Sequence, residues 1–201
     1  MTGESPPRLL TIAGSDSGGG AGIQADLKAF AAAGAHGMSA LVALTAQNTA
    51  AVTAIHELPP EFVVAQLDAV FSDIGVDAAK TGMLFSRRVI EAVADFLATH
   101  PVPLVVDPVV VASSGAQLLE DDAADTLVAR LFPLATVVTP NLAEARALSG
   151  GSMKGSRAQL AEHLVKLGAP AVIVTGGHGD PIDHLFDGER HVEIPVERLD
   201  V

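Results

Sequence analysis

The chain has 201 residues and carries 24 Asp and Glu against 12 Lys and Arg, a formal net charge of −12. Its 49% content of hydrophobic residues excludes intrinsic disorder, and its acidic balance argues against a nucleic-acid partner, which needs a surplus of Lys and Arg. The absence of cysteine excludes disulfides, thiolate metal sites and a cysteine nucleophile within these residues. No apolar run reaches the ~18 residues that a membrane span requires. We therefore expect a cytoplasmic α/β protein with one domain over residues 1–201 and no membrane partner.

In the first half of the chain, short apolar segments alternate with segments of helical period. This alternation predicts βαβ units and a mostly parallel central sheet flanked by helices. Strands are expected at Leu9–Ala13, Met38–Leu44, Ala51–His56, Ala78–Thr81 and Leu104–Val106. Helices are expected at Ile23–Ala33 with Gly34 as its cap, from Pro59 and Pro60 to Phe71, and at Arg87–Thr99.

The second half of the chain continues the same rhythm. Helices are expected at Ala123–Leu131, Leu142–Leu148 and Ser156–Leu167, and strands at Thr136–Thr139 and Ala171–Val174. His184–Phe186 and His191–Pro195 flank Asp187-Gly188 and predict a β-hairpin.

A glycine-rich segment, Gly14–Gly22, lies between the first strand and the first helix and holds five glycines in nine residues. Such a turn lets backbone N–H groups approach a ligand near the positive end of a helix, although a merely flexible turn has the same composition. The segment is not a Walker A loop, and it is a poor dinucleotide fingerprint. Open α/β sheets bind ligands at the carboxyl ends of their strands, so we expect a ligand loop here.

Two polar residues near this loop are candidates for ligand contact. Asp26 lies one turn inside the first helix, where it either balances the helix dipole or faces the loop and holds a ligand. Gln47 follows the second strand; such an amide commonly satisfies loop backbone, yet its donor and acceptor groups also suit the edge of a heterocycle. The residues alone leave both alternatives open.

Asp107 ends a strand, and Asn141 begins a helix with Glu144 three positions later. The Asn141–Glu144 spacing is typical of a capping box. Acidic residues at the carboxyl ends of two strands could also hold Mg²⁺, which prefers oxygen ligands.

A second glycine-rich turn follows a strand at Thr175–Gly179 and contains His178. A single histidine in a loop is commonly solvated, and the histidines show no zinc-site spacing. Lys80, one of four lysines, could balance a phosphate, but we expect it to be a solvated surface residue.

Taken together, six segments resemble one family in their order and spacing across nearly the whole chain. The family is the hydroxymethylpyrimidine / hydroxymethylpyrimidine-phosphate kinases of thiamine biosynthesis. The resemblance implies a ribokinase-like fold, phosphorylation of 4-amino-5-hydroxymethyl-2-methylpyrimidine and/or its monophosphate, ATP and Mg²⁺ as co-reactants, and a homodimer. The segments are Ala13–Asp26, Ala46–Thr49, Lys80–Met83, Asp107–Val109, Thr139–Glu144 and Gly176–His178.

The resemblance also implies roles for individual residues, and it favours a ligand role for Gln47 over the loop role. The residues implied to bind the pyrimidine are Gly14, Asp26, Gln47, Met83 and Val110. The residues implied to lie at ATP or its phosphates are Asn141, Thr175 and Gly177, and those implied to hold Mg²⁺ are Asp107 and Glu144.

The chain departs from the family at two places. The family's Gly-x-Gly-Cys or Gly-x-Gly-Asp turn, which supplies the anion hole and the activating residue, is expected beyond Val201, so no catalytic residue is expected in this chain. Thr175 stands where many relatives have Lys. We therefore expect a C-terminally incomplete domain with impaired activity, or a natural protein that continues past Val201.

Three alternatives accompany this interpretation. A pyridoxal kinase of the same superfamily would need a similar pocket, because pyridoxal also carries a hydroxymethyl group on an aza-ring. A pyrimidine-binding remnant without catalysis would retain the pocket alone. A dinucleotide-binding domain is the least supported, because the glycine fingerprint is absent.

Overall fold

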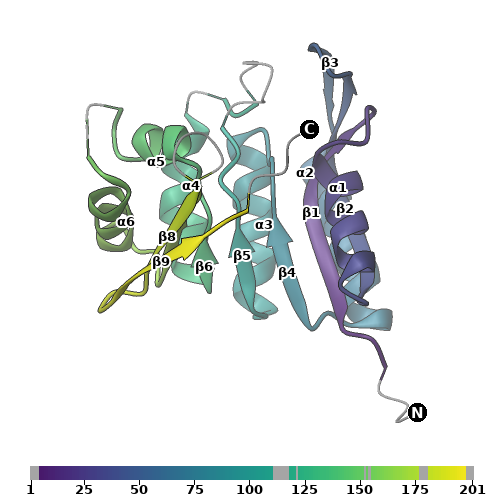
Figure 1. The fold of residues 1–201 in the computed structure, drawn as a ribbon. Coiled ribbons are helices and arrows are strands. Elements are labelled where there is room, and N and C mark those ends of the chain that lie inside the picture. Colours follow the sequence, from purple (N-terminus) through teal and green to yellow (C-terminus); the bar gives the residue numbers. More distant parts are fainter. Residues whose placement is uncertain are drawn as a thin grey trace.

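The structure is a computed structural model that describes residues 5–110, 118–120, 122–151, 153, 155–176 and 181–197. Within these residues one sheet runs in the order β3-β2-β1-β4-β5-β6-β7-β8-β9 (Figure 1). The strands are β1 (Arg8–Asp16), β2 (His36–Gln47), β3 (Val52–Glu57), β4 (Ala78–Thr81), β5 (Leu104–Val106), β6 (Val137–Val138), β7 (Val172–Val174), β8 (Ile182–Phe186) and β9 (His191–Pro195). The pairs from β2 through β7 are parallel, and β3, β8 and β9 are antiparallel additions at the edges. The predicted α/β class with a mostly parallel sheet is confirmed.

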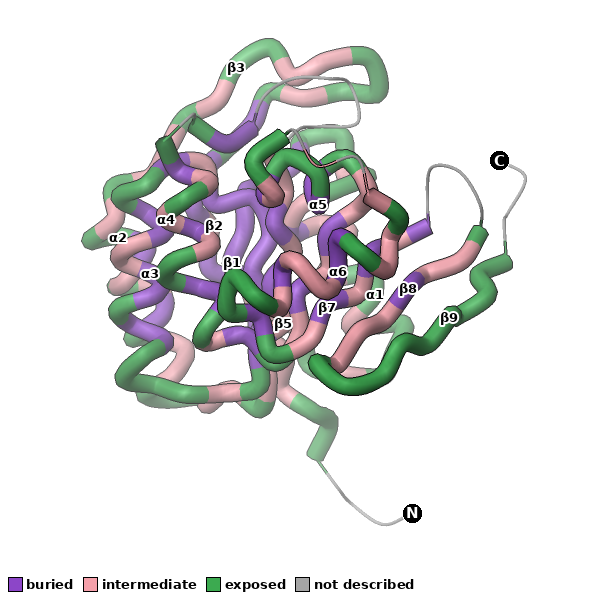
Figure 2. Tube along the Cα trace, turned by 90° about the vertical axis from the view of Figure 1, so that its left-hand side faces the viewer, coloured by how far each residue is buried: buried purple, intermediate pink, exposed green. Residues whose placement is uncertain are grey.

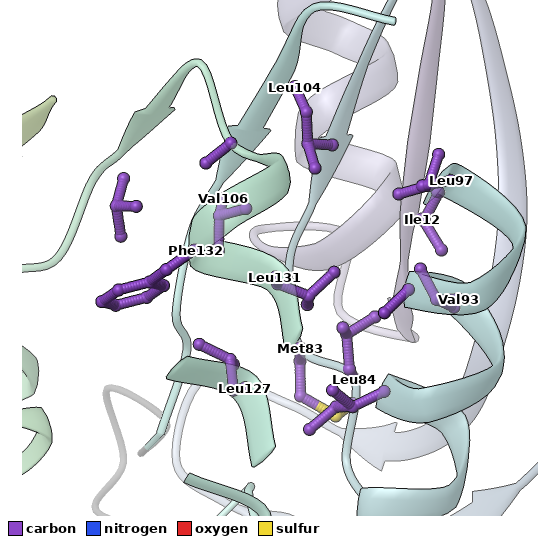
Figure 3. Close-up of a cluster of buried hydrophobic side chains, with 14 of the residues drawn as sticks. Ile12, Met83, Leu84, Val93, Leu97, Leu104, Val106, Leu127, Leu131 and Phe132 are labelled. Carbon is purple, nitrogen blue, oxygen red and sulfur yellow. The ribbon is translucent and has the colours of Figure 1, made fainter. Parts of the chain in front are cut away.

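The helices cover the two faces of the sheet unequally. The helices α2 to α6 pack successively against one another, while α1 packs on β1 and β2 from the opposite face (Figure 1). The side chains of β1 explain this division: Ile12 is fully buried beside Val93 and Leu97 of α3 (Figure 3), whereas Thr11 bonds to Asp26 of α1. The helices are α1 (Gly22–Ala32), α2 (Pro60–Ala69), α3 (Arg87–Thr99), α4 (Ala123–Leu131), α5 (Leu142–Leu148) and α6 (Arg157–Lys166).

Most element boundaries agree with the prediction to within two residues, and several agree residue for residue, including β4, α3, β5, α4 and α5. The first strand is longer than expected, because Ser15 and Asp16 pair with Leu44 and Thr45 of β2 after an irregularity in the ladder. Part of the expected glycine-rich turn is therefore strand. The helix expected to reach Phe71 is α-helical only to Ala69, and the chain continues as a wider π-helical turn over Val70–Ile74.

The core lies between the sheet and the α2–α6 layer, and the buried residues concentrate there while β9 is exposed along its length (Figure 2). Leu104 and Val106 of β5 point to the same side of the sheet, because side chains alternate along a strand, and both belong to the buried cluster that contains Leu131 and Phe132 (Figure 3). Among the helices of the described residues, none combines the length and the apolar character that a membrane crossing requires.

Shortening Leu131 tests this core. Leu131 has no exposed surface, so Leu131→Ala leaves a cavity and should lower the free energy of unfolding by about 2–5 kcal/mol in urea denaturation. Leu167→Ala is the matched control, since Leu167 is 38% exposed and should cost well under half as much. Equal losses for the two variants would contradict the placement of α4 in the core.

Candidate active site

A cavity of about 500 Å³ opens at the carboxyl ends of the parallel strands. Side chains from both ends of the sheet meet there, from the β1–α1 region to the end of β7. This edge is where open α/β sheets bind small molecules. The lining residues are Ala13, Gly14, Ser15, Asp16, Ala21, Gly22, Ala25, Asp26, Thr45, Gln47, Lys80, Gly82, Met83, Asp107, Val109, Leu118, Thr139, Asn141, Glu144 and Thr175.

Eight of the ten predicted site residues line this cavity: Gly14, Asp26, Gln47, Met83, Asp107, Asn141, Glu144 and Thr175. Val110 is not among the lining residues, although its neighbour Val109 is. The backbone of Val110 instead holds neighbouring residues by hydrogen bonds. Its N–H donates to the Glu144 carboxylate, and its carbonyl accepts from the amides of Leu118 and Leu119. Gly177 lies outside the described residues.

The glycine-rich loop is organised by a carboxylate of the chain itself. Asp16 is 5% exposed, and its Oδ1 accepts the N–H of Gly18 at 2.7 Å. Its Oδ2 accepts the N–H groups of Gly20 at 2.9 Å and Ala21 at 2.8 Å. The expectation that these amides are free to approach a ligand is therefore wrong, because an internal anion already satisfies them. The loop is a shaped wall of the cavity, and Asp16 is a site residue that the sequence analysis missed.

Two glycines of this loop lie in close contact with the residues around them. The amide of Gly14 donates to the carbonyl of Met83 at 3.1 Å, and a Cβ on Gly14 would lie 2.2 Å from Met83 Cε. Gly22 has a φ of 56°, and a Cβ there would lie 2.4 Å from the carbonyl oxygen of Gly14. At Gly22 the positive φ and the clash with backbone exclude a side chain, whereas a side chain at Gly14 would displace the end of Met83 from the cavity wall.

A charge bridge crosses the floor of the cavity. Lys80 Nζ lies 3.2 Å from both carboxylate oxygens of Asp26 and 3.1 Å from Asp107 Oδ2. The hydroxyl of Thr11 also donates to Asp26 Oδ2 at 2.7 Å. Asp26 therefore lines the cavity, where Thr11 and Lys80 hold its carboxylate in place. The expectation of a solvated Lys80 is wrong, because strand alternation on β4 points this side chain toward α1 and leaves it 23% exposed.

Gln47 is held at the rim of the cavity by its backbone. Its N–H donates to Ser17 Oγ at 2.8 Å, and that hydroxyl donates to the Gln47 carbonyl at 2.7 Å. The side-chain Oε1 lies 3.2 Å from Thr45 Oγ1. Because the backbone bonds fix the position, the amide side chain is presented to the cavity from a rigid strand end.

The capping box predicted at α5 is confirmed. Asn141 Oδ1 accepts the N–H groups of Ala143 at 2.9 Å and Glu144 at 3.0 Å, while Glu144 Oε2 accepts the N–H of Asn141 at 2.8 Å. Glu144 is 7% exposed, and burial raises its pKa to about 7 against the lowering effect of the Asn141 amide; the charge of Asp107 raises it further. Burial also raises the pKa of Asp107, an effect that Lys80 opposes.

The pair Asp107 and Glu144 can be tested for a fit to Mg²⁺. Their charges interact, and the raised pKa of each reports negative charge in a poorly solvated place that a cation would relieve. No group of three or more acidic or histidine side chains that could hold a metal occurs among the described residues. Mg²⁺ is commonly held by one or two carboxylates together with water and phosphate oxygens, so this pair fits a metal that arrives with a phosphate.

The fold and the cavity define an α/β protein with a cavity of small-molecule size at the carboxyl edge of its sheet. A family model described as phosphomethylpyrimidine kinase matches residues 16–201, and the chain belongs to that family. Its sheet and helices match the ribokinase-like arrangement of solved kinases of this kind.

Three similar proteins illustrate the relationship. The hydroxymethylpyrimidine/phosphomethylpyrimidine kinase of Rhizobium meliloti is 51% identical over 197 residues, which cover 95% of this chain and 74% of that protein. The structure of a phosphomethylpyrimidine kinase from Clostridium difficile matches with a TM-score of 0.86 at 41% identity, covering 95% of this chain and 85% of that one. The ADP complex of Bacillus subtilis pyridoxal kinase matches with the same TM-score at 38% identity, covering 98% and 78%.

Replacing Asp16 tests the origin of the loop's shape. Asp16→Asn places an N–H₂ group among three backbone donors, so it should lower the free energy of unfolding by about 1–3 kcal/mol and speed hydrogen exchange at residues 18–21. Asp68→Asn, on the exposed face of α2, is the matched control. Unchanged exchange at these amides in Asp16→Asn would show that another interaction shapes the loop.

The buried Glu144 should make stability depend on pH. Its folded pKa of about 7 exceeds the ordinary value of 4.5, so its contribution is fully present below pH 4.5 and is lost as the pH rises through 7. The stability of the wild type relative to Glu144→Gln should thus fall by up to about 3 kcal/mol between pH 4.5 and 8, measured by urea denaturation. Glu61→Gln, at an exposed position of α2, is the control. A constant difference across this range would place the Glu144 carboxylate in contact with solvent.

Proposed function

We propose that the protein binds 4-amino-5-hydroxymethyl-2-methylpyrimidine, its monophosphate or both, and phosphorylates them from ATP in thiamine biosynthesis. One observation carries this proposal. The residues implied for the pyrimidine, including Asp26 and Gln47, and those implied for the metal and phosphates, including Asp107 and Glu144, line one continuous cavity. Membership of the phosphomethylpyrimidine kinase family supports the same reaction.

On the substrate side, Asp26 accepts a hydrogen bond from the amino group of the pyrimidine, and Gln47 bonds to the polar edge of the ring. The bare backbone at Gly14 lets the ring approach closely, and Met83 packs on its face. In support, Met83 Sδ and Cε already lie against Gly14, and Thr11 and Lys80 hold the Asp26 carboxylate in place. These residues bind and orient the substrate so that its hydroxymethyl group points along the cavity toward Asp107.

On the phosphate side, Asn141 and Thr175 would contact the nucleotide, and Asp107 and Glu144 would hold Mg²⁺. The bridge between Asn141 and Thr175 brings the ends of β6 and β7 together, which supports a shared role at the phosphates. When bound, Mg²⁺ supplies positive charge to the phosphate oxygens. The hydroxyl oxygen of the substrate forms a bond to the γ-phosphorus, and its proton passes to the activating residue of the Gly-x-Gly turn that the family resemblance implies. The bond from that phosphorus to the β-phosphate oxygen breaks, and ADP leaves.

Pyridoxal phosphorylation is a second candidate function. Pyridoxal kinase from Bacillus subtilis has the same TM-score to this chain as the Clostridium difficile kinase, 0.86. Pyridoxal presents a hydroxymethyl group on a six-membered aza-ring, as the pyrimidine does. Pyridoxal lacks the amino group that Asp26 would bind, and it carries an aldehyde at the corresponding position of its ring.

We further propose that residues 1–201 form a single domain, that the protein works as a homodimer and that it is cytoplasmic. One sheet that runs from Arg8 to Pro195 supports the single domain. The homodimer rests on the family resemblance, and the location rests on the composition of the sequence.

Binding measurements with Asp26→Asn test the proposed function. Calorimetry should detect hydroxymethylpyrimidine binding to the wild type with higher affinity than pyridoxal. Asp26→Asn should weaken pyrimidine binding by about 10- to 100-fold, because it removes a charge-assisted hydrogen bond, and should leave pyridoxal binding much less affected. Asp68→Asn is the control, and ADP release with each alcohol gives the activity. Wild-type protein that binds neither alcohol at millimolar concentration would refute the proposal.

A further inference from the structure

The cavity is markedly acidic for a site proposed to take phosphates. Four carboxylates line it: Asp16, Asp26, Asp107 and Glu144. Among the described lining residues, Lys80 is the one cationic side chain. A phosphate in this cavity therefore meets a surplus of negative charge, and within the described wall the ammonium of Lys80 is the protein's counter-charge to it.

The ammonium of Lys80 can take a ligand oxygen without losing either carboxylate. A lysine ammonium has three N–H donors. Both oxygens of Asp26 lie 3.2 Å from it and Asp107 Oδ2 lies 3.1 Å from it, so a ligand oxygen that replaces one of the two Asp26 oxygens leaves each carboxylate with one donor. The side chain is 23% exposed and lines the cavity, where such an exchange can take place.

The surroundings hold the ammonium in this position. Gly82 has no side chain, and a Cβ there would lie 3.2 Å from Lys80 Nζ and 3.0 Å from Ala13 Cβ. Thr11 is fully buried and anchors Asp26, one of the two carboxylates that hold Lys80. The ammonium thus occupies a built position between the wall that would bind the pyrimidine and the wall that would bind the metal.

We propose that Lys80 is the specificity-determining residue for phosphorylated pyrimidine, and that it binds the phosphate of the substrate during a second phosphoryl transfer. This inference rests on the proposed function. The substituent on the ring must extend from Asp26 toward Asp107 to reach ATP, and Lys80 lies between these two residues. A phosphate on that substituent therefore passes within reach of the Lys80 ammonium.

The second transfer then follows the same course as the first. An oxygen of the substrate monophosphate forms a bond to the γ-phosphorus of ATP. The bond from that phosphorus to the β-phosphate oxygen breaks, and ADP leaves while the pyrimidine diphosphate remains. The attacking phosphate oxygen is already ionised, so this step needs no proton acceptor. The charge of Lys80 offsets the repulsion between the two phosphates as they approach.

The test compares the dissociation constants of the monophosphate and of the unphosphorylated alcohol in the same variant. Lys80→Met should raise the ratio of the two constants by about 10- to 100-fold, because only the monophosphate loses a charge-assisted hydrogen bond. Lys80→Gln, which retains a donor without the charge, should raise the ratio nearly as much, and Lys80→Arg should keep it within about fivefold. Lys28→Met is the matched control, since Lys28 Nζ donates to the Gly19 carbonyl at 2.6 Å and does not line the cavity.

The outcomes separate this inference from the proposed function. Wild-type protein that binds neither ligand refutes the proposed function. Wild-type protein that binds both, with an unchanged ratio in Lys80→Met and Lys80→Gln, refutes the role of Lys80 alone. Equal weakening of both ligands means that Lys80 merely positions Asp26, which also overturns the inference. Thermal melting of each variant identifies loss of folding. If Lys80→Met and Lys80→Gln fail to fold, Lys80→Arg decides the question. A folded Lys80→Arg protein that has lost the preference for the monophosphate would contradict a charge role for Lys80.

Discussion

The ion bridge from Asp26 through Lys80 to Asp107 is the interaction on which the site depends. It joins α1, β4 and the end of β5, three elements that the backbone of the sheet holds in register. The parallel pairing of β1 with β4 and of β4 with β5 brings the carboxyl ends of these strands to one edge, so that one ammonium can reach two carboxylates. Without this shared cation, the two carboxylates would face one another with their mutual repulsion uncompensated.

The same electrostatic situation recurs on the other wall. Glu144 is buried in the capping box of α5. Burial raises its pKa to about 7, and the charge of Asp107 adds to this effect. The cavity is therefore poised to take up positive charge, and Mg²⁺ bound to a phosphate is a partner that brings it. Asp16 differs from these carboxylates, because it accepts hydrogen bonds from three backbone amides of the glycine-rich loop. The loop and the capping box both use carboxylates to shape the walls of the cavity.

The periodicity of the sequence was sufficient for the architecture. The ranges of α3, α4 and β5 follow from apolar spacing that is strong and bounded by clear signals, such as Asp107-Pro108 after β5. The errors fall where pairing between distant segments decides the outcome. Ser15 and Asp16 belong to β1 because Leu44 and Thr45 of β2 lie alongside, and no local pattern in a glycine-rich segment predicts that partner.

The sequence by itself determined the family, the class of fold and most of the residues that line the cavity, because motif spacing and resemblance identify which positions carry polar groups at strand ends. Only the tertiary structure decided what those groups do. It turned Asp16 inward to bind three amides, excluded Val110 from the lining and placed Lys80 between two carboxylates. The physical reason is that a charged side chain takes its role from its partners and its solvation. Both depend on elements that lie far apart in the chain and meet only when the sheet is assembled.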